Sequence, residues 1–116
     1  HGYRRVEAGA QVRDSVIQHR CIIRAGAVVD RAILDKEVTV GRNAKVGYGL
    51  NNIANFERPD IVNTGITIVG KRVVIPEDVN VGRNVVIGPG VESEITGHLE
   101  SGASVHPTHM PLHLFV

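Results

Sequence analysis

Aromatic residues are nearly missing from this 116-residue chain: they make up 3% of it, and none is tryptophan. A β-sandwich or an α/β domain ordinarily fills its wide interior with large aromatic rings. The interior predicted here is therefore narrow and built from small and β-branched side chains. A chain of this length has room for one domain and no second sizeable core.

Strong charge of one sign, disulfides and long apolar runs are lacking as well. Thirteen Lys and Arg residues against twelve Asp and Glu residues give a formal net charge of +1, which argues against a nucleic-acid binder that works through a broad basic field. The single cysteine, Cys21, cannot form an internal disulfide, and this favours a cytoplasmic setting. No apolar run is long enough to span a membrane, and no secretory leader is visible. We expect neither nucleic acid nor a membrane as a partner.

A six-residue repeat of aliphatic residues runs through most of the chain. Between residues 69 and 92 an aliphatic residue recurs every six positions, four times in succession, and valine occupies the fifth position each time. These aliphatic positions are Val69, Ile75, Val81 and Ile87, and the first half has similar spacing at Val6, Val12, Ile17, Ile23, Val29, Leu34, Val40 and Val46. Two of the early intervals shorten to five residues and lie seventeen residues apart. This indicates that the true unit is a three-sided coil of about eighteen residues.

Each six-residue unit predicts a short strand followed by a corner, with one aliphatic side chain pointing into a triangular prism. A period of six does not fit an α-helix. Stacked coils pair backbone to backbone at about 4.8 Å, so no coil is stable without neighbours. The fifth positions, among them Val16, Cys21 and Ile33, are small or apolar, and we expect them to point inward too; for Cys21 this means a buried structural thiol. The predicted fold is an all-β, single-stranded parallel β-helix over residues 1–105.

The repeat is interrupted twice. It fails through residues 48–64, which are rich in asparagine. Asn63 follows Val12, Val29 and Val46 at the same spacing of seventeen residues, so a polar-lined coil would keep the count. We expect a surface loop here instead. Ser93 stands where an aliphatic residue is due. The tail at 106–116 is apolar, contains histidine and has no periodicity, and it is a candidate cap for the open end of the prism.

Three stretches are more specific than the repeat: Asp30-Arg-Ala-Ile-Leu-Asp-Lys36, Val40-Gly-Arg-Asn-Ala-Lys-Val-Gly47 and Thr64-Gly-Ile-Thr-Ile-Val-Gly-Lys71. Together they resemble the carboxy-terminal domain of bacterial glucose-1-phosphate adenylyltransferase (ADP-glucose pyrophosphorylase) over about residues 6–105. The resemblance implies a left-handed coil and a parent enzyme that makes ADP-glucose and pyrophosphate from ATP and glucose 1-phosphate, with Mg²⁺, in glycogen synthesis. It also implies that the nucleotide chemistry belongs to a separate amino-terminal domain.

This chain contains no Gly-rich phosphate loop leading into a helix, so we expect it to be inactive alone, without catalytic residues or a cofactor. His106 and His109 have a chelating spacing but no acidic or Cys partner nearby, so we expect no metal site. In the family that it resembles, the β-helix serves subunit contacts within a tetramer and helps to form regulatory effector sites. The partners implied are the amino-terminal domain of the parent chain, sister subunits and a phosphorylated metabolite effector.

One corner of the predicted prism carries a column of cations. When the units are wrapped onto three sides, two adjacent positions of this corner stack over successive coils. The first position gives His19, Lys36 and Lys71, and the second gives Arg20, Glu37 and Arg72. The five cationic members form a candidate site for a phosphate-bearing effector, held by charge-assisted hydrogen bonds, although Glu37 neutralises part of the charge. The alternative interpretation is an ordinary solvated corner.

A hexapeptide-repeat acyltransferase is the alternative function. Such enzymes use a histidine as general base near a bound acyl-CoA, and His19 is the only histidine inside a clear coil. The Asp30–Lys36 stretch favours the nucleotidyltransferase family instead. Outward residues such as Val74 and Val86 are candidates for docking other parts of the enzyme.

Overall fold

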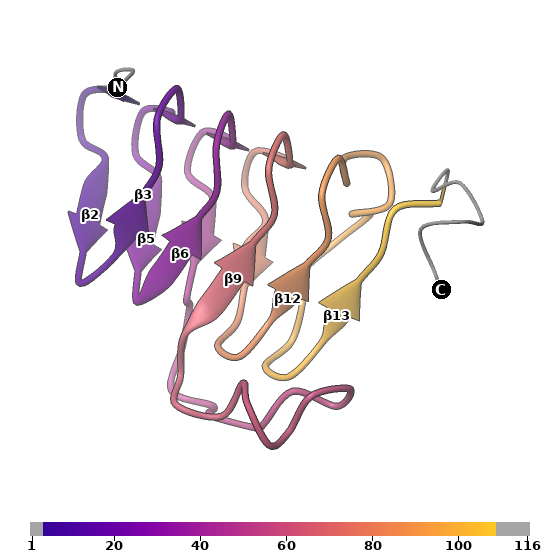
Figure 1. Ribbon diagram of the computed structural model, residues 1–116. Helices are drawn as coiled ribbons and strands as arrows, with labels where there is room; N and C mark the ends of the chain where they lie inside the picture. The colour runs from indigo at the N-terminus through magenta and orange to yellow at the C-terminus, as the bar shows by residue number, and fades with distance from the viewer. Residues whose placement is uncertain (1–3, 109–116) are drawn as a thin grey trace.

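The computed structural model describes residues 4–108. All its strand pairs are parallel, and the strands line three sides of a prism (Figure 1). Sheet A contains β1 (Arg5–Val6), β4 (Ile22–Ile23), β7 (Thr39–Val40) and β10 (Val74–Ile75). Sheet B contains β2 (Gln11–Arg13), β5 (Val28–Asp30), β8 (Lys45–Val46) and β11 (Asn80–Val81). Sheet C contains β3 (Val16–Ile17), β6 (Ala32–Leu34), β9 (Thr67–Val69), β12 (Val86–Ile87) and β13 (Ser104–Val105).

Each coil passes through sheets A, B and C in turn, and the register gives the length of the coil. Arg5 pairs with Ile22 and Ile22 pairs with Thr39, which is a step of seventeen residues. Val86 pairs with Ser104, which is a step of eighteen. The predicted parallel β-helix is confirmed. The described part of the chain forms no helix, and therefore none that could cross a membrane.

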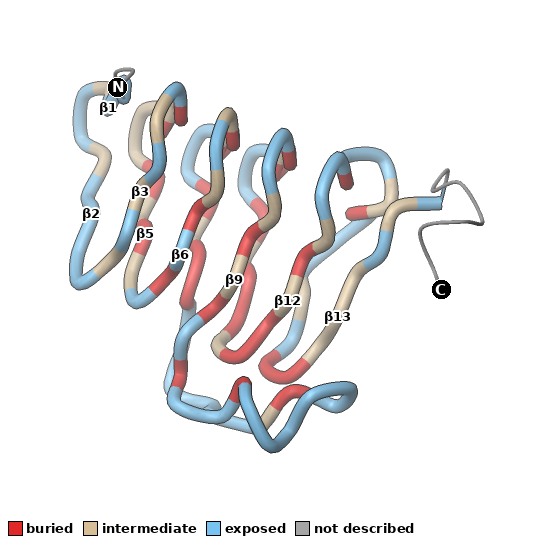
Figure 2. The backbone as a smooth tube through the Cα atoms, in the orientation of Figure 1, coloured by how far each residue is buried: buried red, intermediate tan, exposed pale blue. Residues whose placement is uncertain are grey.

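One hydrophobic cluster, contributed by all three sides, fills the prism. Figure 2 shows the buried positions in red along the tube. The four positions that carry the clearest repeat, Val69 to Ile87, are each at most 1% exposed. The buried cluster consists of Cys21, Ile23, Ala27, Val29, Ala32, Leu34, Val38, Val40, Ala44, Val46, Val69, Val73, Ile75, Val79, Val81, Val85, Ile87, Val91 and Ile95. With two such side chains on each side of a coil, no aromatic ring is needed to fill the interior.

Two groups of residues are more exposed than the repeat predicts. Val6 and Val12 keep the inward register but are 53% and 37% exposed, because no described coil stacks on the outer side of the first one. Val16 and Ile33 were expected to point inward, and that was wrong. Where the interval between inward residues is five, the fifth position comes directly before the next inward residue. Because successive side chains of a strand point to opposite faces, the fifth side chain then points outward. Val16 and Ile33 are accordingly 53% and 37% exposed.

Residues 47–66 leave the coil at the corner between sheets B and C and project from one edge of the prism (Figure 1). β8 ends before this excursion and β9 follows it, yet β9 pairs with both β6 and β12. The third coil therefore closes as the others do. The excursion folds back on later coils: the Phe56 N–H donates to the Gly102 carbonyl at 2.9 Å, and the Ile53 N–H donates to Ser101 Oγ at 2.9 Å. Asn63 is exposed and lines no coil.

Asn55 anchors the excursion from a fully buried position, with 0% of the residue exposed. Its Nδ2 donates to the Asn84 carbonyl at 3.0 Å and to the Ala103 carbonyl at 3.2 Å. Its Oδ1 accepts the N–H groups of Glu57 at 2.9 Å and Arg58 at 3.0 Å. One side chain thus provides hydrogen-bond partners for two N–H groups of the excursion and for two carbonyl groups of the later coils.

The last coil is irregular. Ser93 is exposed, and Ile95 fills the interior in its place at 5% exposure. Glu94 accepts hydrogen bonds from the Thr108 N–H at 2.8 Å and from the Glu92 N–H at 3.1 Å. These bonds lower the pKa of the Glu94 carboxyl to about 2. The suggested cap at 106–116 lies outside the described residues from 109 onward.

Replacing an inward valine should cost far more stability than replacing an outward one. Val40 is 0% exposed and Val16 is 53% exposed. We expect Val40→Ala to lower the free energy of unfolding by about 2–3 kcal/mol, through lost burial and the cavity that remains. Val16→Ala should change it by about 0.5 kcal/mol or less. Urea titration followed by circular dichroism measures both, and equal losses would contradict the inward assignment.

Asn55→Ala should release the excursion while leaving the coil intact. The substitution leaves several buried N–H and C=O groups without partners, at about 1–3 kcal/mol each. We expect faster proteolytic cleavage within residues 47–66 and a lower melting temperature. Asn51→Ala is the matched control because Asn51 lies exposed on the same excursion. Cleavage at the wild-type rate in the Asn55 variant would show that this side chain is not the anchor.

Candidate functional site

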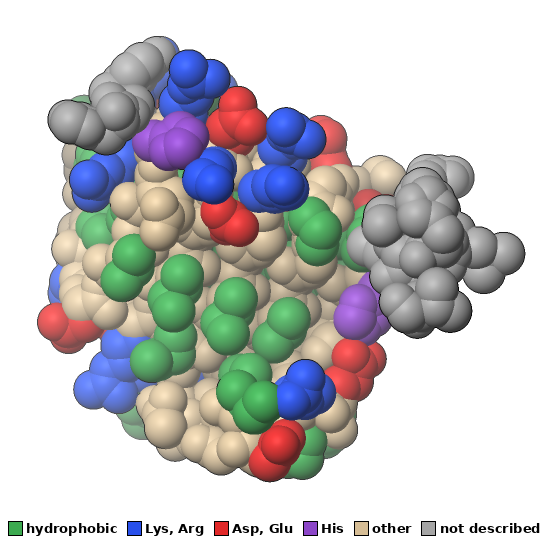
Figure 3. All heavy atoms as spheres, viewed as in Figure 1, with side chains coloured by type: hydrophobic (Ala, Val, Ile, Leu, Met, Phe, Trp, Pro, Cys, Tyr) green, Lys and Arg blue, Asp and Glu red, His purple; other side chains and the backbone are tan. Residues whose placement is uncertain are grey.

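The predicted column of cations lies at the corner between sheets C and A, where the chain turns from one coil into the next. Backbone hydrogen bonds stack the successive turns: the Glu37 N–H donates to the His19 carbonyl at 3.1 Å, and the Arg72 N–H donates to the Lys36 carbonyl at 2.9 Å. The structure thereby brings five cationic residues to one edge, and we call this set the cationic corner: His19, Arg20, Lys36, Lys71 and Arg72. In Figure 3, Lys, Arg, His and acidic side chains gather along the upper edge of the molecule.

The backbone gives these side chains a common direction. Arg20, Glu37 and Arg72 all have left-handed conformations, with φ of 61°, 62° and 60°. Such values are unusual outside Gly, Asn and Asp and carry a local strain. The same conformation at the same corner of three successive coils places the three side chains above one another, about 4.8 Å apart per coil.

Glu37 sits between two arginines. Its Oε1 lies 3.2 Å from Arg72 Nε, and its Oε2 lies 3.8 Å from Arg20 Nη1. The arginine side chains are 70% and 66% exposed, so each pair contributes about 1 kcal/mol at most. Among residues 4–108, Lys36 and Lys71 have no carboxylate within ion-pair distance. Four permanent cations against Glu37 and the adjoining Asp35, which accepts the Lys36 N–H at 2.7 Å, leave the corner net positive.

The side chains of the corner are of the kind that holds an anion. Lys36 and Lys71 are exposed, so a ligand here would be held from one side of the prism. Exposed ammonium and guanidinium groups supply charge-assisted hydrogen bonds to phosphate oxygens. A second surface laid against the corner would exclude water and strengthen those bonds.

Neither described histidine of the coils is arranged as a general base. His19 lies half-buried at the cationic corner, and no carboxylate among the described residues orients its ring. His98 accepts the Asn80 N–H on Nδ1 at 2.9 Å, so its neutral form carries the proton on Nε2. A ring in that state has no free lone pair with which to accept a proton. These two histidines thus give no support to acyl transfer. His106, which follows the last strand, was expected to lack an acidic partner, and that was wrong: its Nε2 lies 2.8 Å from Glu57 Oε1, because the excursion brings Glu57 beside it.

Cys21 is a structural thiol, as predicted. It is 0% exposed, and its Sγ donates to the Asp35 carbonyl at 3.1 Å. Burial raises the pKa of this thiol, so the nucleophilic thiolate is disfavoured. Across residues 4–108 no three His, Cys, Asp or Glu side chains come together as a group that could hold a metal ion.

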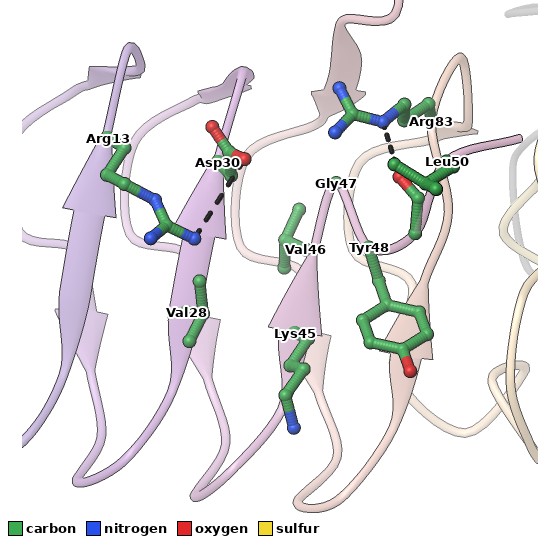
Figure 4. A pocket seen from close by; sticks show the side chains of 10 residues that line it. Arg13, Val28, Asp30, Lys45, Val46, Gly47, Tyr48, Leu50 and Arg83 are labelled. Carbon is green, nitrogen blue, oxygen red and sulfur yellow. Dashed lines mark hydrogen bonds and ion pairs between the residues drawn. The ribbon is translucent and has the colours of Figure 1, made fainter. Parts of the chain in front are cut away.

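A hollow of about 330 Å³ lies where the excursion leaves sheet B (Figure 4). On its wall, Arg13 of β2 lies beside Asp30 of the neighbouring strand β5, with 4.0 Å between Nη2 and Oδ2 (Figure 4). Lys45 Nζ lies 5.9 Å from the centre of the Tyr48 ring. Arg83 Nε donates to the Gly49 carbonyl at 2.7 Å. The repeat pattern gave no signal for this hollow, because Tyr48 and Gly49 reach it only through the course of the excursion.

Comparison with known proteins agrees with this geometry. A family described as GlmU-like, C-terminal hexapeptide matches residues 3–69, which is more than half of the chain. The chain belongs to this family. As a hexapeptide family it accounts for the three-sided coil. Its match covers three of the five residues of the cationic corner, His19, Arg20 and Lys36, and stops just before Lys71.

Relatives within curated proteins confirm the resemblance to glucose-1-phosphate adenylyltransferase. The protein of that name from Thermomicrobium roseum is 51% identical over 97 residues, which are 82% of this chain and 23% of the relative. The one from Acetivibrio thermocellus is 36% identical over 69 residues, which are 60% of this chain and 16% of the relative. This hexapeptide chain thus spans less than a quarter of the length of these relatives. A serine acetyltransferase structure from Entamoeba histolytica aligns over 90% of this chain and 37% of that one, at 16% identity and a TM-score of 0.35.

Removing the carboxylate from the cationic corner should improve anion binding there. Glu37→Gln takes away a negative charge that repels an incoming anion by about 1 kcal/mol, so we expect about fivefold tighter binding of inorganic phosphate. The free energy of unfolding should change by about 1 kcal/mol or less, because the ion pairs are exposed. Calorimetric titration at low ionic strength measures the affinity. Glu77→Gln is the control, since Glu77 is exposed on another corner; an equal gain there would show a general charge effect.

Proposed function

We propose that this chain is the non-catalytic oligomerisation and regulatory domain of a glucose-1-phosphate adenylyltransferase that works in the cytoplasm. The parent enzyme would convert ATP and glucose 1-phosphate to ADP-glucose and pyrophosphate in glycogen biosynthesis. The observation that carries the proposal is the 51% identity to an enzyme of that name over 97 residues of this chain. The Mg²⁺ of that reaction belongs, in this proposal, to the part of the parent enzyme outside these residues.

Two apolar surfaces support a role in assembly with the amino-terminal domain and with sister subunits, which we propose to form a tetramer. The outer face of sheet C carries four aliphatic side chains in a row, one from each of four coils: Val16, Ile33, Ile68 and Val86. Hydrophobic side chains are grouped over these strands in Figure 3. The open end of the first coil exposes Val6 and Val12. Contiguous apolar surface of this kind favours burial against another chain or domain.

The cationic corner supports a regulatory role. Its five residues come from three coils and present amino and guanidinium groups on one edge. In this proposal a phosphorylated metabolite binds there, between the corner and a neighbouring domain of the parent enzyme. The effector would then stabilise one relative placement of the two surfaces, which is how a ligand shifts a conformational equilibrium.

Substitutions at the corner should uncouple regulation from catalysis in the full-length protein that contains this chain. We expect Lys36→Gln combined with Lys71→Gln to weaken the response to inorganic phosphate, used as the probe, by about tenfold or more. The rate of ADP-glucose formation without effector should stay within about twofold. Steady-state assays over a phosphate titration measure both quantities.

The matched control combines Arg58→Gln with Arg42→Gln, which removes the same charge from exposed positions outside the corner. An unchanged response in the Lys36 and Lys71 variant would refute the regulatory site. Absence of ADP-glucose formation by the full-length protein, together with sustained thiol release from acetyl-CoA, would refute the parent activity and favour the acyltransferase.

A further inference from the structure

Two arginines from different coils converge beside the base of the excursion. Arg31 lies at the corner between sheets B and C in the second coil, and Arg83 lies near the same corner in the fourth. The third coil has no ordinary corner between them, because the chain leaves it at residues 47–66. A hollow of about 300 Å³ results, and we call it the Arg31–Arg83 hollow; it is lined by Arg31, Leu50, Asn52, Gly65 and Arg83.

Gly65 gives the scale of this hollow. A Cβ placed on Gly65 would lie 3.9 Å from Arg31 Nη1 and 3.8 Å from Arg83 Nη1. The two guanidinium nitrogens are therefore no more than about 8 Å apart. Hydrogen bonds of about 2.8 Å from each arginine to different oxygens of one tetrahedral anion span such a gap. A glycine keeps the space between the two groups free of a side chain.

The hollow presents more hydrogen-bond donors than acceptors, because each guanidinium carries five N–H groups. Arg83 Nε donates to the Gly49 carbonyl at 2.7 Å, which fixes the guanidinium. Asn52 Oδ1 accepts from Asn84 Nδ2 at 2.7 Å and would lie 3.5 Å from a Cβ on Gly65, and the Asn52 NH₂ has no acceptor among the described residues. Within residues 4–108 neither Arg31 nor Arg83 forms an ion pair. The closest carboxylate in sequence, Asp30, lies 4.0 Å from Arg13.

We propose that Arg31, Arg83 and Asn52 form a binding site for a tetrahedral oxyanion, either inorganic phosphate or the phosphate group of a monoester. Asp30 lines the neighbouring hollow together with Arg83 but forms no ion pair with it. Two guanidinium groups without an ion-paired carboxylate repel each other, and a dianion between them removes that repulsion. This site lies on a different corner of the prism from the cationic corner. It is therefore independent of the regulatory role proposed above.

The Gly65 amide provides a local readout in the 116-residue chain. Inorganic phosphate, glycerol 3-phosphate and acetate are titrated separately at low ionic strength, and the Gly65 and Asn52 signals are followed by ¹⁵N NMR. We expect saturable shifts with both phosphates and much weaker ones with acetate, which lacks the second charge. Tighter binding of the monoester identifies a metabolite as the ligand, and equal binding identifies free phosphate; both results support the site.

Two variants test the arginines. Arg31→Asn suits the left-handed backbone at this position, where φ is 51°. Arg83→Lys keeps the charge but loses the planar fork. We expect each to weaken binding by about tenfold, with melting curves confirming the fold. Arg42→Gln, an exposed cation on the corner between sheets A and B, should change the affinity by about twofold or less.

Failure of the Gly65 signal to shift with either phosphate would overturn the proposal. So would wild-type affinity in both folded arginine variants, or an equal loss in Arg42→Gln, which would indicate only the general field of the protein. Lys36→Gln leaves the Gly65 response intact if the two anion sites are separate, and abolishes it if they are not.

Discussion

Parallel pairing of each coil with the next is the interaction on which the rest of the structure depends. A strand of two or three residues has no stability alone, and each gains it only from the strand in the same place one coil away. Registers of seventeen or eighteen residues hold every inward side chain above its counterpart, as Ile23 lies over Val40. The first coil shows the converse, since Val6 and Val12 are exposed where stacking stops.

The same stacking brings corner residues of successive coils together on one edge. A residue that follows sheet C in one coil lies beside its counterpart in the next, so His19, Lys36 and Lys71 become neighbours although 52 positions separate the first from the last. A single-residue change in one turn therefore alters one step of a column. This makes a solenoid suited to binding anions along an edge, since charge accumulates by repetition.

The excursion interrupts the repeat without breaking the pairing of the strands. Its 20 residues are inserted at one corner, and the coil closes over the gap because β9 still pairs on both sides. Asn55 and Asn84 supply the polar contacts that tie it down, and Asn84 donates to both Asn52 Oδ1 and the Ile53 carbonyl. Bringing this segment against the prism creates hollows that a regular coil lacks.

The amino-acid sequence by itself determined the prism, its core and the cationic corner, because each follows from residues at a fixed local spacing. The sequence pattern placed Val16 and Ile33 inside the prism, which was wrong. On a side of five residues the inward positions come one residue earlier, and counting six from the preceding repeat misses that change. Only the tertiary structure decided where the excursion folds back, how Arg31 meets Arg83, and that Asn55 is buried. Those contacts join residues whose separation follows no period, so their geometry depends on how the chain closes in space.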